Sequence, residues 1–260
     1  MPRKSVESEP VDSDATTRGR WLLIYMQRFL LASLAVLSLA SGCGDTDKVG
    51  SLPDAPIAPD ASMIDVPAGP ATVISTDFEG ALPPSIDVGD CAGTPSQGYA
   101  PLGLAGNQFG ATFLRCQTGN AIVINVTNLP THTKLSLGFL FAAIDSLDGT
   151  GSFPAGDFVK ITLDGTEIFR ESFANAELTQ IQSYIAPPGG ELARHVDLGF
   201  SGPGGNYTDS AYDMNVDGRF QNLPHTGSTA TIMFTLEGAG VQSLDDESWA
   251  IDNLRITATP

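Results

Sequence analysis

The side chains with the clearest capacity for chemistry are aspartates in polar segments between apolar stretches. Asp145 and Asp148 follow an apolar run, Asp157 opens the next one, and Asp209 opens a later one. Calcium prefers six to eight oxygen ligands from carboxylates and carbonyls, so loops that gather several aspartates predict at least one bound calcium. The EF-hand pattern is absent, because Asp145 and Asp148 are three residues apart and no Glu occupies position twelve. The alternative is a solvated acidic surface that keeps the protein soluble.

Enzyme motifs are scarce in this chain. The histidines His132, His195 and His225 form no HExxH pattern, there is no CxxC, and each histidine is predicted to be a surface or turn residue. Residues 199–203 suggest a nucleophile elbow, but Pro203 stands where the final Gly is required. A glycosidase needs two carboxylates at a set separation, and 30 acidic residues make such a pair easy to invent. We predict a non-catalytic protein, and a hydrolase with a loop-borne acid pair remains the alternative.

The net charge limits the classes of partner that this protein can bind. The sequence contains 13 Lys and Arg residues and 30 Asp and Glu residues, which gives a net charge of −17. Nucleic-acid binding needs a basic face, so that partner is excluded, whereas cations, neutral sugars and basic proteins stay open.

Aromatic side chains are the usual platforms for pyranose rings, but they make up only 8% of this sequence. Most Phe residues fall on predicted core positions, which leaves Tyr99, Tyr184, Tyr207 and Tyr212. Tyr207, in a Gly-rich loop, is the preferred candidate, and the alternative for it is a tyrosine that covers a sheet end. The predicted ligand contacts are Asn206, Tyr207, Tyr212 and Trp249.

Alternating apolar residues predict the strands that must position these groups. The pattern is clear in 134–141, 157–163 and 229–236, and Asp164-Gly165 predicts a tight hairpin turn into 166–169. Further strands are predicted near 72–78, 111–116, 121–126, 211–216 and 248–257, and the single candidate helix is 174–184. About nine strands with Gly-rich connections indicate an all-β fold, an antiparallel β-sandwich of the jelly-roll kind, over 72–260.

In the last predicted strand, the apolar residues move from odd-numbered to even-numbered positions, which would place them on opposite faces of a regular strand. Trp249 and Ile251 occupy one parity, and Leu254 and Ile256 occupy the other. Either both faces of the strand are covered, or a bulge at 252–253 shifts the register. Asp252 is then an acid inside an apolar strand, which must be hydrogen-bonded or metal-bound to be tolerated.

The segment 246–254, which begins with two of the acids of the run 245–247, resembles the closing "DESWGIDN" strand of extracellular lectin-like or concanavalin-like sandwich domains, with Ala250 in place of the usual Gly. The opening Asp77-Phe78-Glu79-Gly80 fits the same arrangement. Many such jelly rolls resemble carbohydrate-binding modules, in which acids of the first and last strands hold a structural calcium. By that resemblance Glu79 and Asp252 are calcium ligands, with Asp77 nearby. The group is functionally mixed, so the fold carries over better than the ligand.

The N-terminal region resembles a bacterial lipoprotein signal. An uncharged apolar run, 29–40, is too short to span a membrane and suits a signal peptide. It leads into Ser41-Gly42-Cys43, which resembles a lipobox whose Cys receives a lipid, although Ala40 stands where Leu is best known. The prediction is a signal region over 1–42, with translation starting at Met26, and a membrane anchor on Cys43. Gly44 rather than Asp after the cysteine favours the outer membrane, on its periplasmic or exterior side.

A Pro-rich segment, 43–71, follows the predicted anchor and is typical of a disordered, semi-rigid spacer. Two cysteines remain in the domain, Cys91 and Cys116. Exported proteins meet oxidising conditions, so we predict that these two pair and close a loop of about 25 residues, worth about 3 kcal/mol. Two buried free thiols are the alternative.

Together these features predict a lipid-anchored, non-catalytic binding module of the cell envelope, with carbohydrate as the ligand class and calcium as a structural ion. The alternative is a structural or adhesive envelope protein that binds another protein. A hydrolase ranks third.

Overall fold

The computed structural model describes residues 69–260 apart from 151–155, 203, 206 and 239–241. The signal region 1–42, Cys43 and most of the spacer 43–71 lie outside the described residues. The described chain is built from strands and three short 3₁₀ helices, η1 (Gln97–Tyr99), η2 (Met214–Val216) and η3 (Gly218–Phe220). In this part of the chain no helix is long and apolar enough to cross a membrane.

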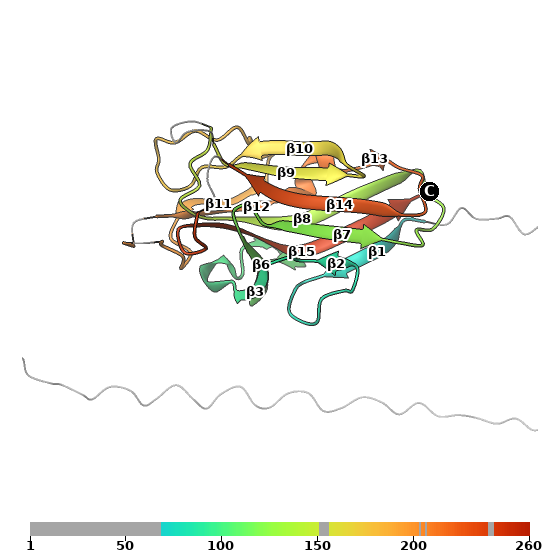
Figure 1. Ribbon diagram of the computed structural model, residues 1–260, viewed down its shortest axis with the longest axis horizontal. Coiled ribbons are helices and arrows are strands. Elements are labelled where there is room, and N and C mark those ends of the chain that lie inside the picture. The colour runs from blue at the N-terminus through green and yellow to red at the C-terminus, as the bar shows by residue number, and fades with distance from the viewer. Residues whose placement is uncertain (1–68, 151–155, 203, 206, 239–241) are drawn as a thin grey trace, which may run out of the picture. The chain divides into compact units, whose positions relative to one another are not determined.

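Two antiparallel sheets pack face to face, which confirms the predicted sandwich (Figure 1). The first sheet has the order β11-β12-β8-β15-β6-β3, with β1 beside β15 and β13 beside β8. Its strands are β1 (Ala71–Thr76), β3 (Ala92–Pro95), β6 (Thr112–Gln117), β8 (Lys134–Asp145), β11 (Glu191–Val196), β12 (Asp209–Asp213), β13 (Leu223–Pro224) and β15 (Glu247–Thr259). The second sheet has the order β10-β9-β14-β7-β2. Its strands are β2 (Ile86–Asp87), β7 (Ala121–Val126), β9 (Phe158–Leu163), β10 (Thr166–Ser172) and β14 (Ala230–Glu237).

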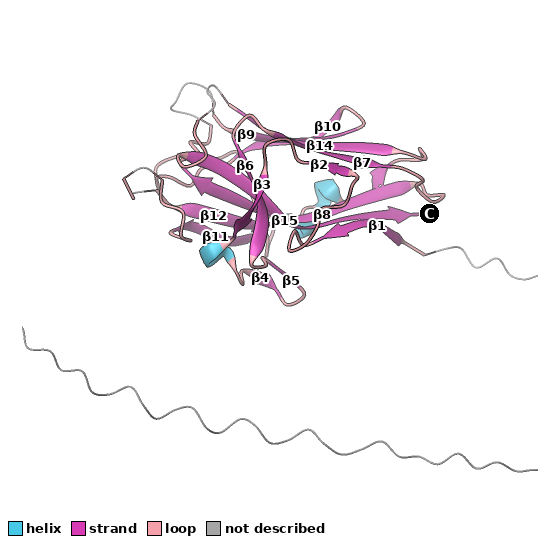
Figure 2. Ribbon diagram, turned by 60° about the horizontal axis from the view of Figure 1, so that its bottom comes forward, coloured by secondary structure: helices cyan, strands magenta, loops and turns pink. Residues whose placement is uncertain are grey.

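Consecutive long strands cross from one sheet to the other, as a jelly roll requires. β6 leads to β7, β8 to β9 and β14 to β15, and each of these steps changes sheet. A small separate hairpin, β4 (Gly103–Leu104) with β5 (Asn107–Gln108), projects beside the first sheet (Figure 2).

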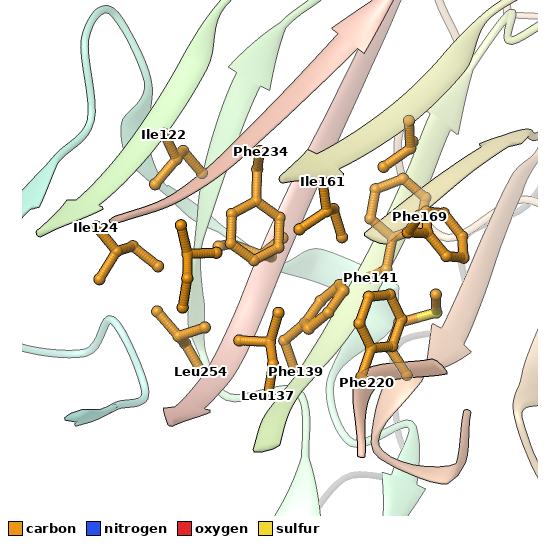
Figure 3. Close-up of a cluster of buried hydrophobic side chains, with 14 of the residues drawn as sticks. Ile122, Ile124, Leu137, Phe139, Phe141, Ile161, Phe169, Phe220, Phe234 and Leu254 are labelled. Atoms are coloured by element: carbon orange, nitrogen blue, oxygen red, sulfur yellow. The ribbon is translucent and has the colours of Figure 1, made fainter. Parts of the chain in front are cut away.

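The main core lies between the sheets. Figure 3 shows Phe139 of the first sheet and Phe234 of the second pointing toward each other, and their ring centroids are 5.1 Å apart. Phe220 of η3 closes the same cluster, with its ring 5.3 Å from that of Phe139. The apolar parity predicted from the sequence is the parity that faces this interior, so period-two alternation is explained by burial between two layers.

The outer face of the first sheet is also covered. Leu140, Ala142 and Ala250 on this face pack under Tyr99 and Phe200, which come from the connections around η1 and before β12. Burial on both faces explains why β8 is apolar along nearly its whole length instead of alternating.

The predicted bulge in the last strand is present. The pairing of β15 with β8 shifts register between Asp252 and Arg255, and Asn253 has a φ of 47°. Before the shift β15 pairs with β6 through Ile251, and after it β15 pairs with β1 from Leu254. The extra residue therefore lets Leu254 and Ile256 enter the same core as Trp249 and Ile251.

Two further local predictions can be compared with the structure. Cys91 and Cys116 form a disulfide, as predicted. The turn at Asp164-Gly165 has positive φ at both residues, which is the geometry of a two-residue hairpin, and it joins β9 to β10. The single candidate helix, 174–184, is not formed, because these residues make turns and irregular chain and none of them is helical.

Candidate binding groove and acidic centres

One concave site of about 620 Å³ lies at the edge of the first sheet, and we call it the sheet-edge groove. Strands β1 and β15, the β4–β5 hairpin and η2 contribute to it. Its lining residues are Ser75, Thr76, Asp77, Leu104, Ala105, Gly106, Asn107, Asp213, Asn215, Val216, Asn253 and Arg255.

A hydrogen-bonded network fixes the floor of the sheet-edge groove. Asp213, which is buried, accepts a hydrogen bond at 3.1 Å from the side-chain amide of Asn107. It also accepts hydrogen bonds from the backbone N–H and the side-chain amide of Asn215, at 2.9 and 2.7 Å. These contacts hold the β4–β5 hairpin to the end of β12, so the groove has a preorganised polar base.

The rim of the groove is more exposed than its floor and carries cationic, acidic and apolar side chains. Arg255 is exposed on β15, Asp77 is exposed at the end of β1, and Leu104 at the hairpin tip is 63% exposed. Amides, hydroxyls and carboxylates with one guanidinium offer donors and acceptors together, which suits a neutral polyhydroxylated ligand. None of the lining residues is aromatic.

Most of the predicted aromatic ligand contacts are wrong. Tyr212 and Trp249 are 0% exposed and belong to the core between the sheets, while Tyr99 and Tyr184 are also buried. Their large apolar rings are used for packing, so no face remains for a sugar. Tyr207 is half-buried and lies away from the groove lining, against Gly202. Its predicted neighbour Asn206 lies outside the described residues.

The predicted metal ligands do not gather at one place, and the structure divides them among three acidic centres. The first centre contains Asp77, Glu79 and Asp252. It lies at the point of β15 where its neighbour on one side changes from β6 to β1. Asp252 accepts hydrogen bonds from the backbone N–H groups of Gly110 and Asn253, at 2.8 and 2.7 Å. Burial, as the largest cause, raises the pKa of Asp252 to about 7, and the nearby carboxylates add to the effect.

The second centre holds Asp145 and Asp209 under the outer face of the first sheet. Asp209 accepts backbone hydrogen bonds from Leu198 at 2.9 Å and from Asp145 at 3.1 Å, which anchors the connection that covers this face. Burial raises the pKa of Asp209 to about 7 and that of Asp145 to about 6. Arg115 lies 3.4 Å from the Asp145 carboxylate and 4.5 Å above the Phe200 ring. Both carboxylate oxygens of Asp209 thus have partners, whereas Asp145 has Arg115 at one oxygen and no partner among the described residues at the other.

The third centre contains Asp148, Asp157 and a residue outside the predicted ligand set, Glu247. The backbone N–H of Asp148 donates to the Asp157 carboxylate at 2.9 Å. Glu247 is 0% exposed, and neither of its carboxylate oxygens has a hydrogen-bond partner at ordinary geometry among the described residues. Burial, followed by the Asp157 carboxylate, raises the pKa of Glu247 to about 9. The acidic run 245–247 is visible in the sequence, but no feature of the sequence indicates that Glu247 is buried.

Across the described residues, no three Asp, Glu, His or Cys side chains are already arranged to hold a metal. Among the histidines, each predicted to be a surface or turn residue, His132 is buried in the connection that precedes β8, so the surface alternative does not hold for it. Its Nε2 lies 2.7 Å from Nδ1 of His225, whose Nε2 lies 3.1 Å from the Asp164 carboxylate. The paired rings connect two loops at one end of the sandwich.

No family model matches this chain, and no curated protein matches it. Solved structures resemble it at low identity. A tandem CBM22-1–CBM22-2 domain of Paenibacillus barcinonensis Xyn10C is 14% identical over 72% of this chain and 50% of that one, with a TM-score of 0.33. A cycloisomaltooligosaccharide glucanotransferase of Paenibacillus sp. is 16% identical over 65% of this chain and 17% of that one, with a TM-score of 0.31. The catalytic domain of a GH87 α-1,3-glucanase is 15% identical over 74% and 28%, with a TM-score of 0.29. This chain thus matches half or less of each of these structures, and similarities of this extent identify neither a family nor a ligand.

Proposed function

We propose that this domain is a non-catalytic module that binds a neutral oligosaccharide in the sheet-edge groove. The observation that carries the proposal is the groove itself, which combines about 620 Å³ of space with a fixed network of Asp213, Asn107 and Asn215. Each sugar hydroxyl can donate and accept, and a floor of amides and a carboxylate offers both kinds of partner. Exposed apolar contact on the rim comes from Leu104 and Val216.

The absence of aromatic side chains from the groove lining shapes the expected specificity. A stacking platform tolerates many sugars, whereas a polar floor leaves buried groups unpaired when the pattern of hydroxyls is wrong. We therefore expect modest affinity and narrow selectivity among glycans. Export through the predicted signal and anchoring by lipid on Cys43 would place this groove in the cell envelope, at the outer membrane.

A glycan array probed with the purified protein tests the proposal, followed by titration of the best ligand. Arg255→Ala removes the exposed cationic donor on the rim and should weaken binding about tenfold, the usual effect of losing one charged hydrogen bond. Arg170→Ala is the matched control, because Arg170 is an exposed arginine of β10 in the second sheet. Unchanged affinity in Arg255→Ala, or no glycan bound at all, would contradict the proposed site.

A second candidate function is adhesion to another envelope protein. It is favoured by three large apolar side chains on the segment between β10 and β11, Leu178, Ile181 and Ile185, which are 82%, 72% and 85% exposed. Ile181 and Ile185 line the same depression of the surface, and exposed apolar side chains that form a patch are typical of interaction surfaces. A protein that bound no glycan, and whose cross-links to an envelope protein disappeared with Ile185→Ser, would support this alternative.

A further inference from the structure

The third acidic centre lies at the end of the sandwich where three segments meet. Asp148 follows β8 and Glu247 opens β15, both in the first sheet, while Asp157 directly precedes β9 in the second sheet. From here β15 runs to the C-terminus at the opposite end of the sandwich (Figure 1). The centre therefore joins the two layers and is separate from the sheet-edge groove, whose lining contains none of these three residues.

Glu247 is the unusual member of this group. Its side chain is 0% exposed, and among the described residues neither carboxylate oxygen has a partner at ordinary hydrogen-bond geometry, its nearest polar side chains being Asp157 and Gln242. Its closest charged neighbours are the carboxylates of Asp157 and Asp148. An ionised carboxylate in such a place costs several kcal/mol unless something positive compensates it.

No basic side chain of the described residues provides that compensation. The nearest candidate on the neighbouring strand, Arg115 of β6, pairs in register with Ala250, and both contribute to the outer side of the first sheet. Its guanidinium is already engaged by Asp145, Ser248 and the carbonyl of Leu244. Glu247 has the same strand parity as Trp249 and Ile251, which face the core between the sheets, so Arg115 on the opposite face cannot satisfy it.

The atoms around Glu247 are those that a hard cation prefers. Asp157 uses one carboxylate oxygen to accept from Asp148, and its other oxygen, which lies near Gly238, accepts no hydrogen bond from the described residues. The side-chain amide of Gln242 approaches Glu247 through its N–H, which favours the ionised carboxylate. The carboxylates of Glu247 and Asp157 offer oxygen ligands alone, with no His or Cys beside them, which favours calcium over zinc.

We infer that Glu247 and Asp157 form a calcium site that ties the first sheet to the second at this end of the sandwich. Two carboxylates are fewer than calcium needs, so amide or main-chain oxygens and water complete the shell. Asp148, whose carboxylate also accepts from Gln180, is held beside the ion by its backbone bond to Asp157. This inference does not depend on the proposed glycan groove.

Thermal unfolding of the full chain in calcium-free buffer, and again with CaCl₂, tests the site. At a calcium concentration 100 times Kd, the wild-type Tm should rise by about 5–10 °C. Glu247→Gln should abolish the rise and, without calcium, should melt at or above the wild-type temperature, because Gln keeps the shape of the side chain and is neutral. Glu167→Gln is the matched control, an exposed glutamate on β10 whose loss should leave the calcium response intact.

The alternatives give distinct results. A wild-type Tm that ignores calcium would mean that Glu247 carries a proton instead of facing an ion, and it would overturn the inference. A calcium response that persists in Glu247→Gln would place the ion elsewhere, for example at Glu79 and Asp252. If Glu247→Gln fails to fold, Asp157→Asn replaces it, and calorimetric titration of the wild type with CaCl₂ must still find a bound ion.

Discussion

Removing the Cys91–Cys116 disulfide has an effect that can be calculated from its place in the chain. The bridge joins residues 25 apart, and in the chain-entropy model a closed loop of that size restricts the unfolded state by about 3.5 kcal/mol. For a domain of this size, that loss corresponds to a fall in Tm of about 7–14 °C. We therefore expect Cys91→Ala/Cys116→Ala to melt lower than the oxidised wild type by this amount, measured by calorimetry at one pH and one calcium concentration.

Ligand binding should respond less than stability to the same change. The closed loop contains the β4–β5 hairpin, which forms one wall of the sheet-edge groove. That loop is also fastened by Tyr99, which is fully buried and donates a hydrogen bond from its hydroxyl to the carbonyl of Ala143 at 2.9 Å. Glycan affinity should thus fall less than tenfold.

Reduction of the wild type with a phosphine is the control for these two substitutions, and it should lower Tm to the same extent. A Tm within about 2 °C of the oxidised protein would refute the reasoning, because it would mean that the unfolded chain is already constrained without the bridge.

Two further predictions concern pH and location. Burial raises the pKa of Glu247 to about 9 and that of Asp252 to about 7, so the folded chain keeps protons that the unfolded chain releases. The resulting stability is complete below about pH 4 and is lost as the pH rises through 7 and 9, so Tm in EGTA should fall from pH 5 to pH 9; a rise over that range would be contrary evidence. Cys43→Ser should abolish incorporation of radiolabelled palmitate and release the protein from the membrane fraction; equal labelling of variant and wild type would exclude Cys43 as the modified residue.

The strands were predictable where burial alternates or is continuous. Alternation located β9 and β14 to within a residue or so, because each places one face on the core. β11 was missed, since its residues are mostly half-buried and include Glu191 and Arg194, so no apolar parity marks it. The very short strands β2, β4, β5 and β13 carry too few residues for any periodic signal.

The grouping of the acidic residues was harder to predict than the strands, because residues that are close in the sequence need not be close in the fold. Asp145 and Asp148 are three residues apart, yet they enter different centres. Asp145 ends β8 with a φ of 64°, which redirects the chain, and Asp148 then lies beside Asp157 in the interlayer. The group implied by resemblance, Glu79 and Asp252 with Asp77 nearby, lies together in the structure.

The covering of the first sheet explains why a groove without aromatic residues is found at its edge. Tyr99, Phe113 and Phe200 pack together over the outer face, with Tyr99 and Phe113 ring centroids 5.5 Å apart. Aromatic side chains that could have formed an open sugar platform are used there to seal the sheet. Beyond the bulge at Asp252, β15 leaves β6 and pairs with β1, and the sheet-edge groove opens beside these two strands. The same bulge that restores the core parity of β15 therefore marks the boundary between the sealed part of this sheet and its accessible edge.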